Sequence, residues 1–378
     1  MMLKQFIVFW IVVIFLIGCG SGSQAGKDAS NSNVKVLAET FDDIGLEQLN
    51  RYRNFAGMTG FSINKSLTMV AQKHASYQIE NNLYTHDEQN KTLSQRAIEA
   101  GYTYNRDISE NIYAGNVTSE TSIDILFSNI YHRLAFLDFG FDEIGFGMGA
   151  SEDYAFKKVY TYEMGRANSR LSNENQNPKI VLWPYENQQN VMPVFYEELP
   201  DPLPECSVSG YPISIQFNPA KNGKIKLASF ALYDDLGEVV DSKLLRRDQH
   251  LSDKEFVLMP LTRLKWGTTY HVKALYSEDN SKNKLLEWDF NTKSLPEPYF
   301  IVEDTNQNYT IKSGETYHFY LPPKDCNDKF NTYTYKYSYG LKVEERMVDN
   351  NTMKFKITGS GTVEIKTDNG KKIILTVN

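Results

Sequence analysis

The side chains that could bind a metal or activate water are few in this sequence and widely spaced. Six histidines and three cysteines occur among 378 residues. His74, His86 and His132 fall in a region of helical periodicity, and the other three histidines form no cluster in sequence (His250, His271 and His318). Three cysteines are too few for a disulfide scaffold or a four-cysteine zinc site. No local motif brings these groups together, so any site depends on the fold.

Two other classes of function find no support in the sequence. The run from Gly145 to Gly149 lacks the lysine and the following helix of a phosphate-binding loop, and its alternation is typical of a strand. No Gly-x-Ser-x-Gly nucleophile elbow is present. Lys and Arg number 40 against 47 Asp and Glu, a net charge of -7 with no basic block. This balance argues against nucleic acid as a partner.

Residues 1–19 have the pattern of an export signal. Lys4 precedes an apolar run over 6–17, and Gly18 and Cys19 follow it. A helix of this length covers about 18 Å, which is too short for a hydrocarbon core of about 30 Å. A basic start, a short apolar run and a small residue at its end indicate a signal peptide rather than a membrane span.

The end of this segment, Leu16-Ile17-Gly18-Cys19, resembles a bacterial lipobox. The resemblance implies that Cys19 is lipidated and becomes the mature N-terminus. The lipid would attach the protein to its partner, a membrane of the cell envelope. Gly20 rather than an acidic residue follows the cysteine, which implies the outer membrane if the host is Gram-negative. The alternative is a plain signal peptide with an incidental cysteine.

The rest of the chain divides by composition and periodicity. Residues 20–39 are a polar, flexible tether, and 40–168 combine helical segments (64–82, 92–100 and 119–134 among them) with a β-hairpin. Five prolines between 184 and 204 indicate a stiff connector over 169–204. Residues 205–294 and 295–378 alternate as short strands separated by turns. We therefore predict an α+β domain followed by two β-sandwich-like domains.

The helical part resembles the bacterial branch of the CAP superfamily, named for cysteine-rich secretory, antigen 5 and pathogenesis-related proteins. The resemblance rests on Tyr84-Thr85-His86-Asp87, on 108–115 (Ile-Ser-Glu-Asn-Ile-Tyr-Ala-Gly) and on Tyr131-His132-Arg133. Supporting residues occur in the same order between about 44 and 166, ending with 141–147 before the hairpin. The family fold is an α-β-α sandwich with an open cleft.

This resemblance implies three cleft residues, His86, Glu110 and His132. In the wider family two histidines and two glutamates face the cleft, and some members bind a divalent metal; two imidazoles and a carboxylate suit zinc. The second glutamate precedes the second histidine on its helix, but 127–130 here contain no acidic residue. The alternative is that Glu110 satisfies buried backbone groups and the histidines are polar cleft walls. His74 lies on an apolar helix face and is expected in the core.

Features of the later segments suggest modules rather than catalysis. The stretch 264–270 and the stretch 288–292 resemble the end of a bacterial Ig-like domain. Cys206 and Cys326 would remain in an oxidising compartment, where a bridge between the two β domains can form. Alternating tyrosines over 332–339 share one strand face, which favours packing in a sheet over a carbohydrate-stacking platform.

Three functions stay open at this point. The favoured one is a membrane-anchored lipoprotein whose CAP domain binds a lipid-like or envelope-derived ligand, with a divalent metal such as zinc left open as a cofactor. The second is a metal-dependent hydrolase of peptide or envelope substrate using His86, Glu110 and His132. The third is a structural or adhesive envelope protein with an inert cleft.

Overall fold

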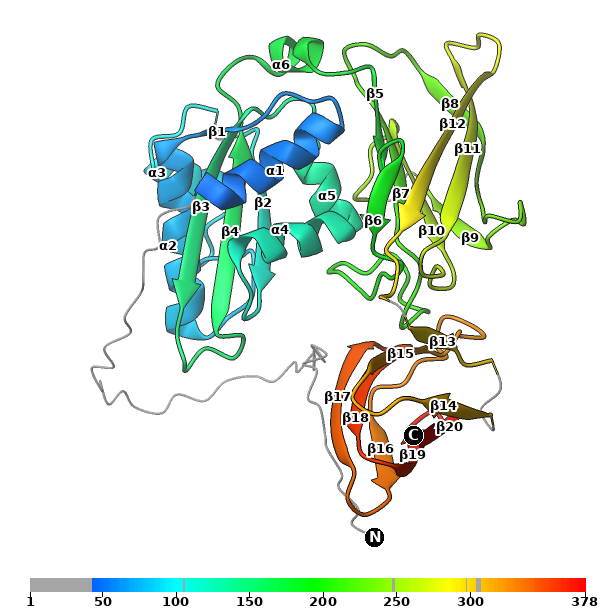
Figure 1. The fold of residues 1–378 in the computed structure, drawn as a ribbon. Coiled ribbons are helices and arrows are strands. Elements are labelled where there is room, and N and C mark those ends of the chain that lie inside the picture. Colours follow the sequence, from blue (N-terminus) through cyan, green and yellow to red (C-terminus); the bar gives the residue numbers. More distant parts are fainter. Residues whose placement is uncertain (1–42, 105, 247–248, 297, 304–306) are drawn as a thin grey trace, which may run out of the picture.

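The computed structural model describes residues 43–378 apart from 105, 247–248, 297 and 304–306. The expected signal peptide, Cys19 and the tether lie outside the described residues. Within them, no helix is long and apolar enough to cross a membrane. The described chain forms an α-β-α domain followed by two β-sandwiches (Figure 1), as the sequence predicts.

The first domain is built on a four-stranded sheet in the order β1-β3-β4-β2. Its strands are β1 (Ser62–Ile63), β3 (Glu143–Ala150), β4 (Lys158–Gly165) and β2 (Ser109–Ala114). Helices α2 (Lys65–Asn81) and α3 (Leu93–Glu99) lie on one side of this sheet. Helices α1 (Asp43–Phe55), α4 (Ser119–Ser128) and α5 (Ile130–Phe136) lie on the other (Figure 1).

Alternating residues of the central strands separate the two helical layers. Phe146 and Tyr162 face the aromatic core beneath α1, α4 and α5, whereas Gly145 and Gly147 face α2. A Cβ on either glycine would overlap backbone atoms of α2. The glycines of this strand therefore allow a helix to approach the sheet closely, and they form no phosphate loop.

The helix predicted over 119–134 is two helices. Asn129 has extended backbone angles (φ -88°, ψ 135°), which end α4 and start α5 in a new direction. The side chain of Asn129 makes no capping hydrogen bond to α5. Glu198, far along the chain, accepts the hydrogen bond from the first residue of α5 instead.

The second domain is a sandwich of two four-stranded sheets. One sheet has the order β5-β7-β10-β9, with β5 (Ile180–Trp183), β7 (Ile213–Phe217), β10 (Glu255–Pro260) and β9 (Ser242–Leu245). The other has the order β6-β12-β11-β8, with β6 (Gln188–Val191), β12 (Lys284–Thr292), β11 (Thr269–Glu278) and β8 (Ile225–Tyr233). The segment 169–204, expected as a connector, thus supplies α6 (Arg170–Gln176) and two strands of this sandwich.

The third domain repeats the two-sheet plan. Its first sheet has the order β13-β15-β18-β17, with β13 (Tyr299–Ile301), β15 (Thr316–Tyr320), β18 (Thr352–Thr358) and β17 (Lys342–Asp349). Its second sheet has the order β14-β20-β19-β16, with β14 (Asn308–Ile311), β20 (Lys372–Val377), β19 (Gly361–Thr367) and β16 (Tyr333–Tyr337). Tyr333 and Tyr335 are buried in the core between the sheets, whereas Tyr339, beyond the strand, is fully exposed.

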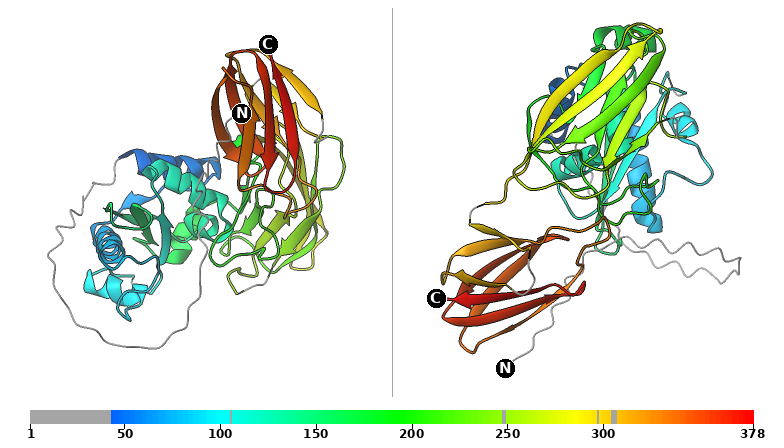
Figure 2. Two further views of the ribbon diagram at one scale, coloured as in Figure 1. Left: turned by 90° about the horizontal axis from the view of Figure 1, so that it is seen from below. Right: turned by 90° about the vertical axis from the view of Figure 1, so that its right-hand side faces the viewer.

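Buried contacts join the three domains. Trp183 of β5 donates a hydrogen bond to the hydroxyl of Tyr211 (2.9 Å), which donates to the carbonyl of Phe127 in α4 (3.1 Å). The second and third domains are linked by a disulfide between Cys206 and Cys326. Figure 2 shows the C-terminal sandwich adjoining the second domain rather than the sheet of the first.

Candidate functional site

The structure brings two of the three expected cleft residues together. His86 lies in the loop after α2, and Glu110 lies on β2. The Nδ1 atom of His86 is 2.8 Å from Oε1 of Glu110. The imidazole is 59% exposed, whereas the carboxylate is 3% exposed. A solvent-facing ring is therefore held from behind by a buried acid.

Arg96 of α3 holds the other oxygen of this acid. Its Nη1 atom donates to Oε2 of Glu110 at 2.9 Å and lies 3.4 Å from Oε1 of Glu163. Its Nη2 atom donates to the backbone carbonyl of His86 at 3.2 Å. One buried guanidinium thus positions both members of the His86–Glu110 pair.

His74 lies deeper in the same cluster. Its ring is completely buried, with Nδ1 3.0 Å from Oε2 of Glu88 and Nε2 2.9 Å from the carbonyl of Thr85. The Nε2 atom is also 3.8 Å from Oε2 of Glu110. His74 is therefore a buried member of the polar cluster behind His86 and has no exposed surface of its own.

Two carboxyl groups in the cluster have shifted pKa values of opposite sign. Burial by itself would raise the pKa of Glu110, but hydrogen bonds from His86, Glu163 and Arg96 and the nearby His74 lower it to about 2. For Glu163, burial and the charge of Glu110 raise the pKa well above the ordinary value. The cluster therefore favours the ionised form of Glu110 and the protonated form of Glu163.

Glu163 is a residue that the sequence analysis did not identify. It lies on β4 opposite Glu110, one residue after a buried tyrosine, and its side chain is completely buried. The available signal was a single acid within a strand of buried residues. An acid in such a position is rarely left unpaired.

His132, the third expected cleft residue, lies elsewhere. The side chain of Asn111, next to Glu110 on β2, donates to the carbonyl of His132 at 2.9 Å. Neighbouring strand residues point to opposite faces of a sheet, so His132 lies across the sheet from the Glu110 carboxylate. No hydrogen bond or ion pair joins His132 to His86 or Glu110 in the described structure.

The partner of His132 is Glu198, in the extended segment after β6. Oε2 of Glu198 is 2.9 Å from Nδ1 of His132, and its side chain is completely buried. The same carboxylate accepts hydrogen bonds from the backbone N–H groups of Ile130 (2.6 Å) and Tyr131. Glu198 therefore caps the N-terminus of α5, where Asn129 does not.

This arrangement does not fit a metal held by His86, Glu110 and His132. Both oxygens of Glu110 are engaged, one by the cationic Arg96, and His132 is paired across the sheet. Over the part of the chain that the structure describes, no group of three or more His, Cys, Asp or Glu residues is placed to hold a metal ion.

The chemistry available at His86 is recognition or proton transfer by one ring atom. Ionised Glu110 accepts the Nδ1–H proton, which fixes the tautomer of the neutral ring and leaves Nε2 as an acceptor with no hydrogen-bond partner among the described residues. Such an imidazole can accept a proton from a bound hydroxyl or amide. Among the described residues, no Ser, Thr or Cys side chain is hydrogen-bonded to the His86 ring.

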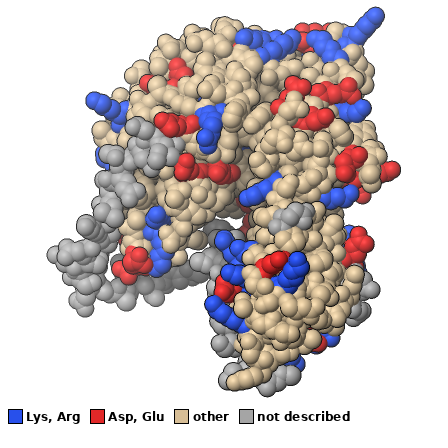
Figure 3. Space-filling view, in the orientation of Figure 1, with Lys and Arg blue, Asp and Glu red and all other residues tan. Residues whose placement is uncertain are grey.

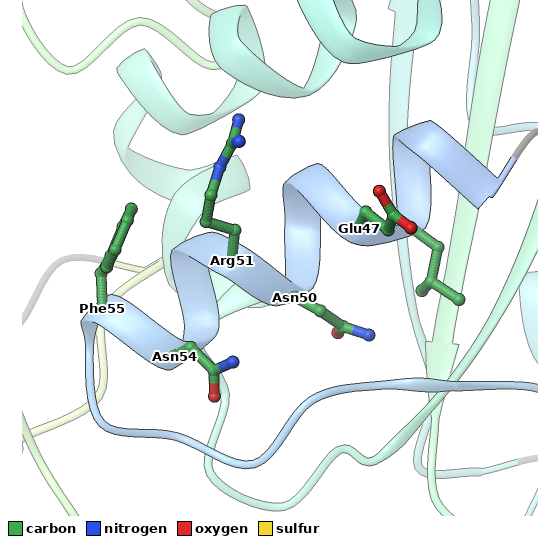
Figure 4. Close-up of a pocket in the computed structure, with 6 residues that line it drawn as sticks. Glu47, Asn50, Arg51, Asn54 and Phe55 are labelled. Carbon is green, nitrogen blue, oxygen red and sulfur yellow. The ribbon is translucent and has the colours of Figure 1, made fainter.

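Two surface hollows of this domain are lined mainly by residues of helices and do not include His86. One of about 530 Å³ is lined by residues of α1, and Figure 4 shows Glu47, Asn50, Arg51, Asn54 and Phe55 extending from that helix. Another, of about 420 Å³, follows the exposed face of α2 between Ile63 and Lys73. These side chains spread from a single helix and do not converge, so neither hollow forms an enclosed site.

Comparison with known proteins identifies the first domain. Residues 46–163 match the model of the cysteine-rich secretory protein (CAP) family. No curated protein matches the sequence. Among solved structures, an outer surface protein from Borrelia burgdorferi is similar at 16% identity, covering 35% of this chain and 99% of its own, with a TM-score of 0.31.

Two further structures come from other bacteria. An extracellular protein with an SCP domain from Bacillus anthracis matches at 22% identity over 33% of this chain, with a TM-score of 0.28. A cysteine-rich secretory protein from Staphylococcus aureus matches at 20% identity over 32% of this chain, with a TM-score of 0.26. This chain spans 41% and 37%, respectively, of those two chains.

Proposed function

Because residues 46–163 are a CAP domain, we propose that this chain is a membrane-anchored envelope lipoprotein whose CAP domain binds a ligand at His86. The observation that carries the proposal is the exposed imidazole fixed by the buried, ionised Glu110. Burying the Glu110 carboxylate behind the exposed imidazole costs free energy of desolvation. Hydrogen bonds from His86, Glu163 and Arg96 offset that cost, and they hold the exposed ring in one orientation.

The geometry supports binding better than hydrolysis. Hydrolysis requires a nucleophile or a metal-activated water beside the base. Among the described residues, no hydroxyl or thiol is hydrogen-bonded to the His86 ring, and Arg96 occupies one oxygen of Glu110 that a metal would need. We therefore favour a binding protein over a metal-dependent hydrolase.

The free atom of His86 indicates the chemistry of the ligand. With Nδ1–H donated to Glu110, the Nε2 atom of a neutral ring accepts a hydrogen bond and cannot donate one. The complementary ligand presents an O–H or N–H group, as sugars and peptides of a cell envelope do. A purely apolar lipid tail would leave Nε2 without a partner.

The anchor in this proposal comes from the sequence. The short apolar run ending at Gly18-Cys19 supports export and lipidation of Cys19, and Gly20 supports the outer membrane in a Gram-negative host. The CAP domain would then face the envelope polymers at the end of a short tether.

The test is calorimetric titration of soluble peptidoglycan fragments into the chain starting at Gly20. His86→Ala is the test variant, and His271→Ala is a matched control because His271 is also exposed and paired with an acid, Asp289, at 2.7 Å. We expect saturable binding that His86→Ala weakens at least tenfold and His271→Ala leaves unchanged. Equal affinity in all three proteins, or no binding by the parent chain, would overturn the proposal for this ligand class.

A further inference from the structure

The outer face of the sheet β13-β15-β18-β17 carries more cations than acids: Glu344, which is paired with Lys342, also lies opposite Lys356. Arg346 of β17 and Lys356 of β18 are exposed, and Lys354 of β18 is partly buried. In the described structure none of the three has a carboxylate within ion-pair distance. The nearby Lys342 is paired with Glu344 at 2.9 Å and so contributes no free charge. We call Arg346, Lys354 and Lys356 the basic face.

The strand register places like charges side by side. Arg346 is directly opposite Lys354, whereas Lys356 is directly opposite Glu344. His318 of β15, opposite Lys354, has its pKa lowered by burial and by the charge of that lysine, which favours a neutral ring. Like charges opposite one another weaken a sheet. The core does not require them, because the inward residues of β18, Met353 and Phe355, are the ones packed between the sheets. The core therefore does not need these outward cations, and the Arg346–Lys354 pair is available to a bound anion.

The other sheet of the same domain shows the usual arrangement. There, Lys366 and Lys372 share Glu364, at 3.4 and 2.8 Å. The whole chain has a net charge of -7, so an unpaired group of cations departs from its general balance. In Figure 3, blue side chains with red ones among them lie on the side of the C-terminal domain where Figure 1 draws β17 and β18.

We propose that the basic face docks the third domain onto the phosphate headgroups of an anionic membrane. The choice of a membrane rests on the proposed lipid anchor. A tether of about 20 residues has a typical span of only about 25 Å, which keeps the folded domains close to the bilayer. Screening at physiological salt limits the attraction to about 8 Å, so the face must lie against the surface.

An exposed aromatic residue favours a membrane as well. Tyr339 is fully exposed in the turn between β16 and β17, three residues before Lys342. Tyrosine is enriched at the headgroup level of bilayers, where its ring is apolar and its hydroxyl is hydrated. A basic sheet face with a tyrosine at its end matches the polarity of that interface.

The test is cosedimentation of the unlipidated chain starting at Gly20 with vesicles containing 30% phosphatidylglycerol. The test variant is Arg346→Gln/Lys354→Gln/Lys356→Gln. The matched control is Lys226→Gln/Lys282→Gln/Lys293→Gln, which removes the same charge from exposed, unpaired lysines of the second domain. His86→Ala is included to separate the two proposals, because loss of ligand binding at His86 would leave vesicle binding intact.

We expect the parent chain, the control and His86→Ala to bind these vesicles, to release at 0.5 M salt, and not to bind phosphatidylcholine vesicles. The test variant should bind at least tenfold more weakly and keep its melting temperature. Equal loss in the test variant and the control would overturn the proposal, because it would reflect net charge alone. Absence of binding by the parent chain, or binding of soluble polyphosphate without any binding of vesicles, would also overturn it.

Discussion

Glu198 and His132 are 66 residues apart in sequence, and their side chains meet at 2.9 Å in a buried position. The contact joins the segment that follows β6 to the N-terminus of α5. The α helices on that side of the CAP domain are thereby fixed to the second domain. His132 has a structural role in this arrangement, while His86 stays exposed on the other side of the sheet.

Removal of the Glu198 carboxylate should destabilise this junction. Glu198→Ala leaves His132 and two backbone N–H groups without their acceptor, and a buried unpaired donor costs about 1–3 kcal/mol. We expect the free energy of unfolding in urea to fall by about 3 kcal/mol. The neighbouring Glu197 is exposed, so Glu197→Ala is the control and should change little. A loss below about 0.5 kcal/mol for Glu198→Ala would contradict the cap.

The ionised state of Glu110 should contribute to stability above its ordinary pKa. Its folded-state pKa of about 2 lies below the ordinary value of 4.5. The contribution is therefore fully present above pH 4.5 and is lost as the pH falls toward 2, and a shift of this size corresponds to about 3 kcal/mol. Glu110→Gln should be less stable than the parent at pH 7, with the difference narrowing below pH 4.5 in urea titrations. A difference independent of pH would contradict the assignment.

Glu163 should have the opposite pH dependence. Its folded-state pKa is raised, so the stability that its protonated form supplies is complete below the ordinary pKa and declines as the pH rises above it. Glu163→Gln keeps a neutral donor beside Glu110 and removes this decline. We expect its melting temperature to exceed that of the parent by a margin that grows from pH 5 to pH 8. A margin that shrinks over this range would show that Glu163 is ionised.

The disulfide should stabilise the attachment of the third domain. Cys206 and Cys326 are 120 residues apart, and bonds closing long loops typically contribute about 2–4 kcal/mol. We expect reduction, or Cys206→Ser/Cys326→Ser, to lower the melting temperature and to make the segment between the second and third domains easier to cleave by protease. Unchanged cleavage would show that noncovalent contacts, among them the Arg263–Asp349 ion pair at 2.6 Å and the Trp266–Thr352 hydrogen bond, hold the two domains together without the disulfide.

The α-β-α layers and the meeting of His86 with Glu110 are predicted by the resemblance of the sequence to the CAP superfamily, because 24 residues separate the two side chains and no local motif joins them. The sequence does not predict that Glu198 caps α5, since the cap depends on how a distant segment returns to that helix. The helix break at Asn129 was missed for the same reason. Pro184 and Pro193 indicate a connector, but the residues between them include a strand that pairs with β12, a pairing that only the tertiary fold specifies.

The most direct test of the ligand site is a nitrogen–proton NMR spectrum of the histidine rings in the chain starting at Gly20, recorded during addition of soluble peptidoglycan fragments. Our account predicts that His86 carries its neutral-state proton on Nδ1, that its Nε2 resonance shifts on addition, and that Glu110→Gln disturbs both. The ring of His132, held by Glu198, should not respond. A His86 ring protonated on Nε2, or an Nε2 resonance unchanged at saturating fragment, would contradict the account.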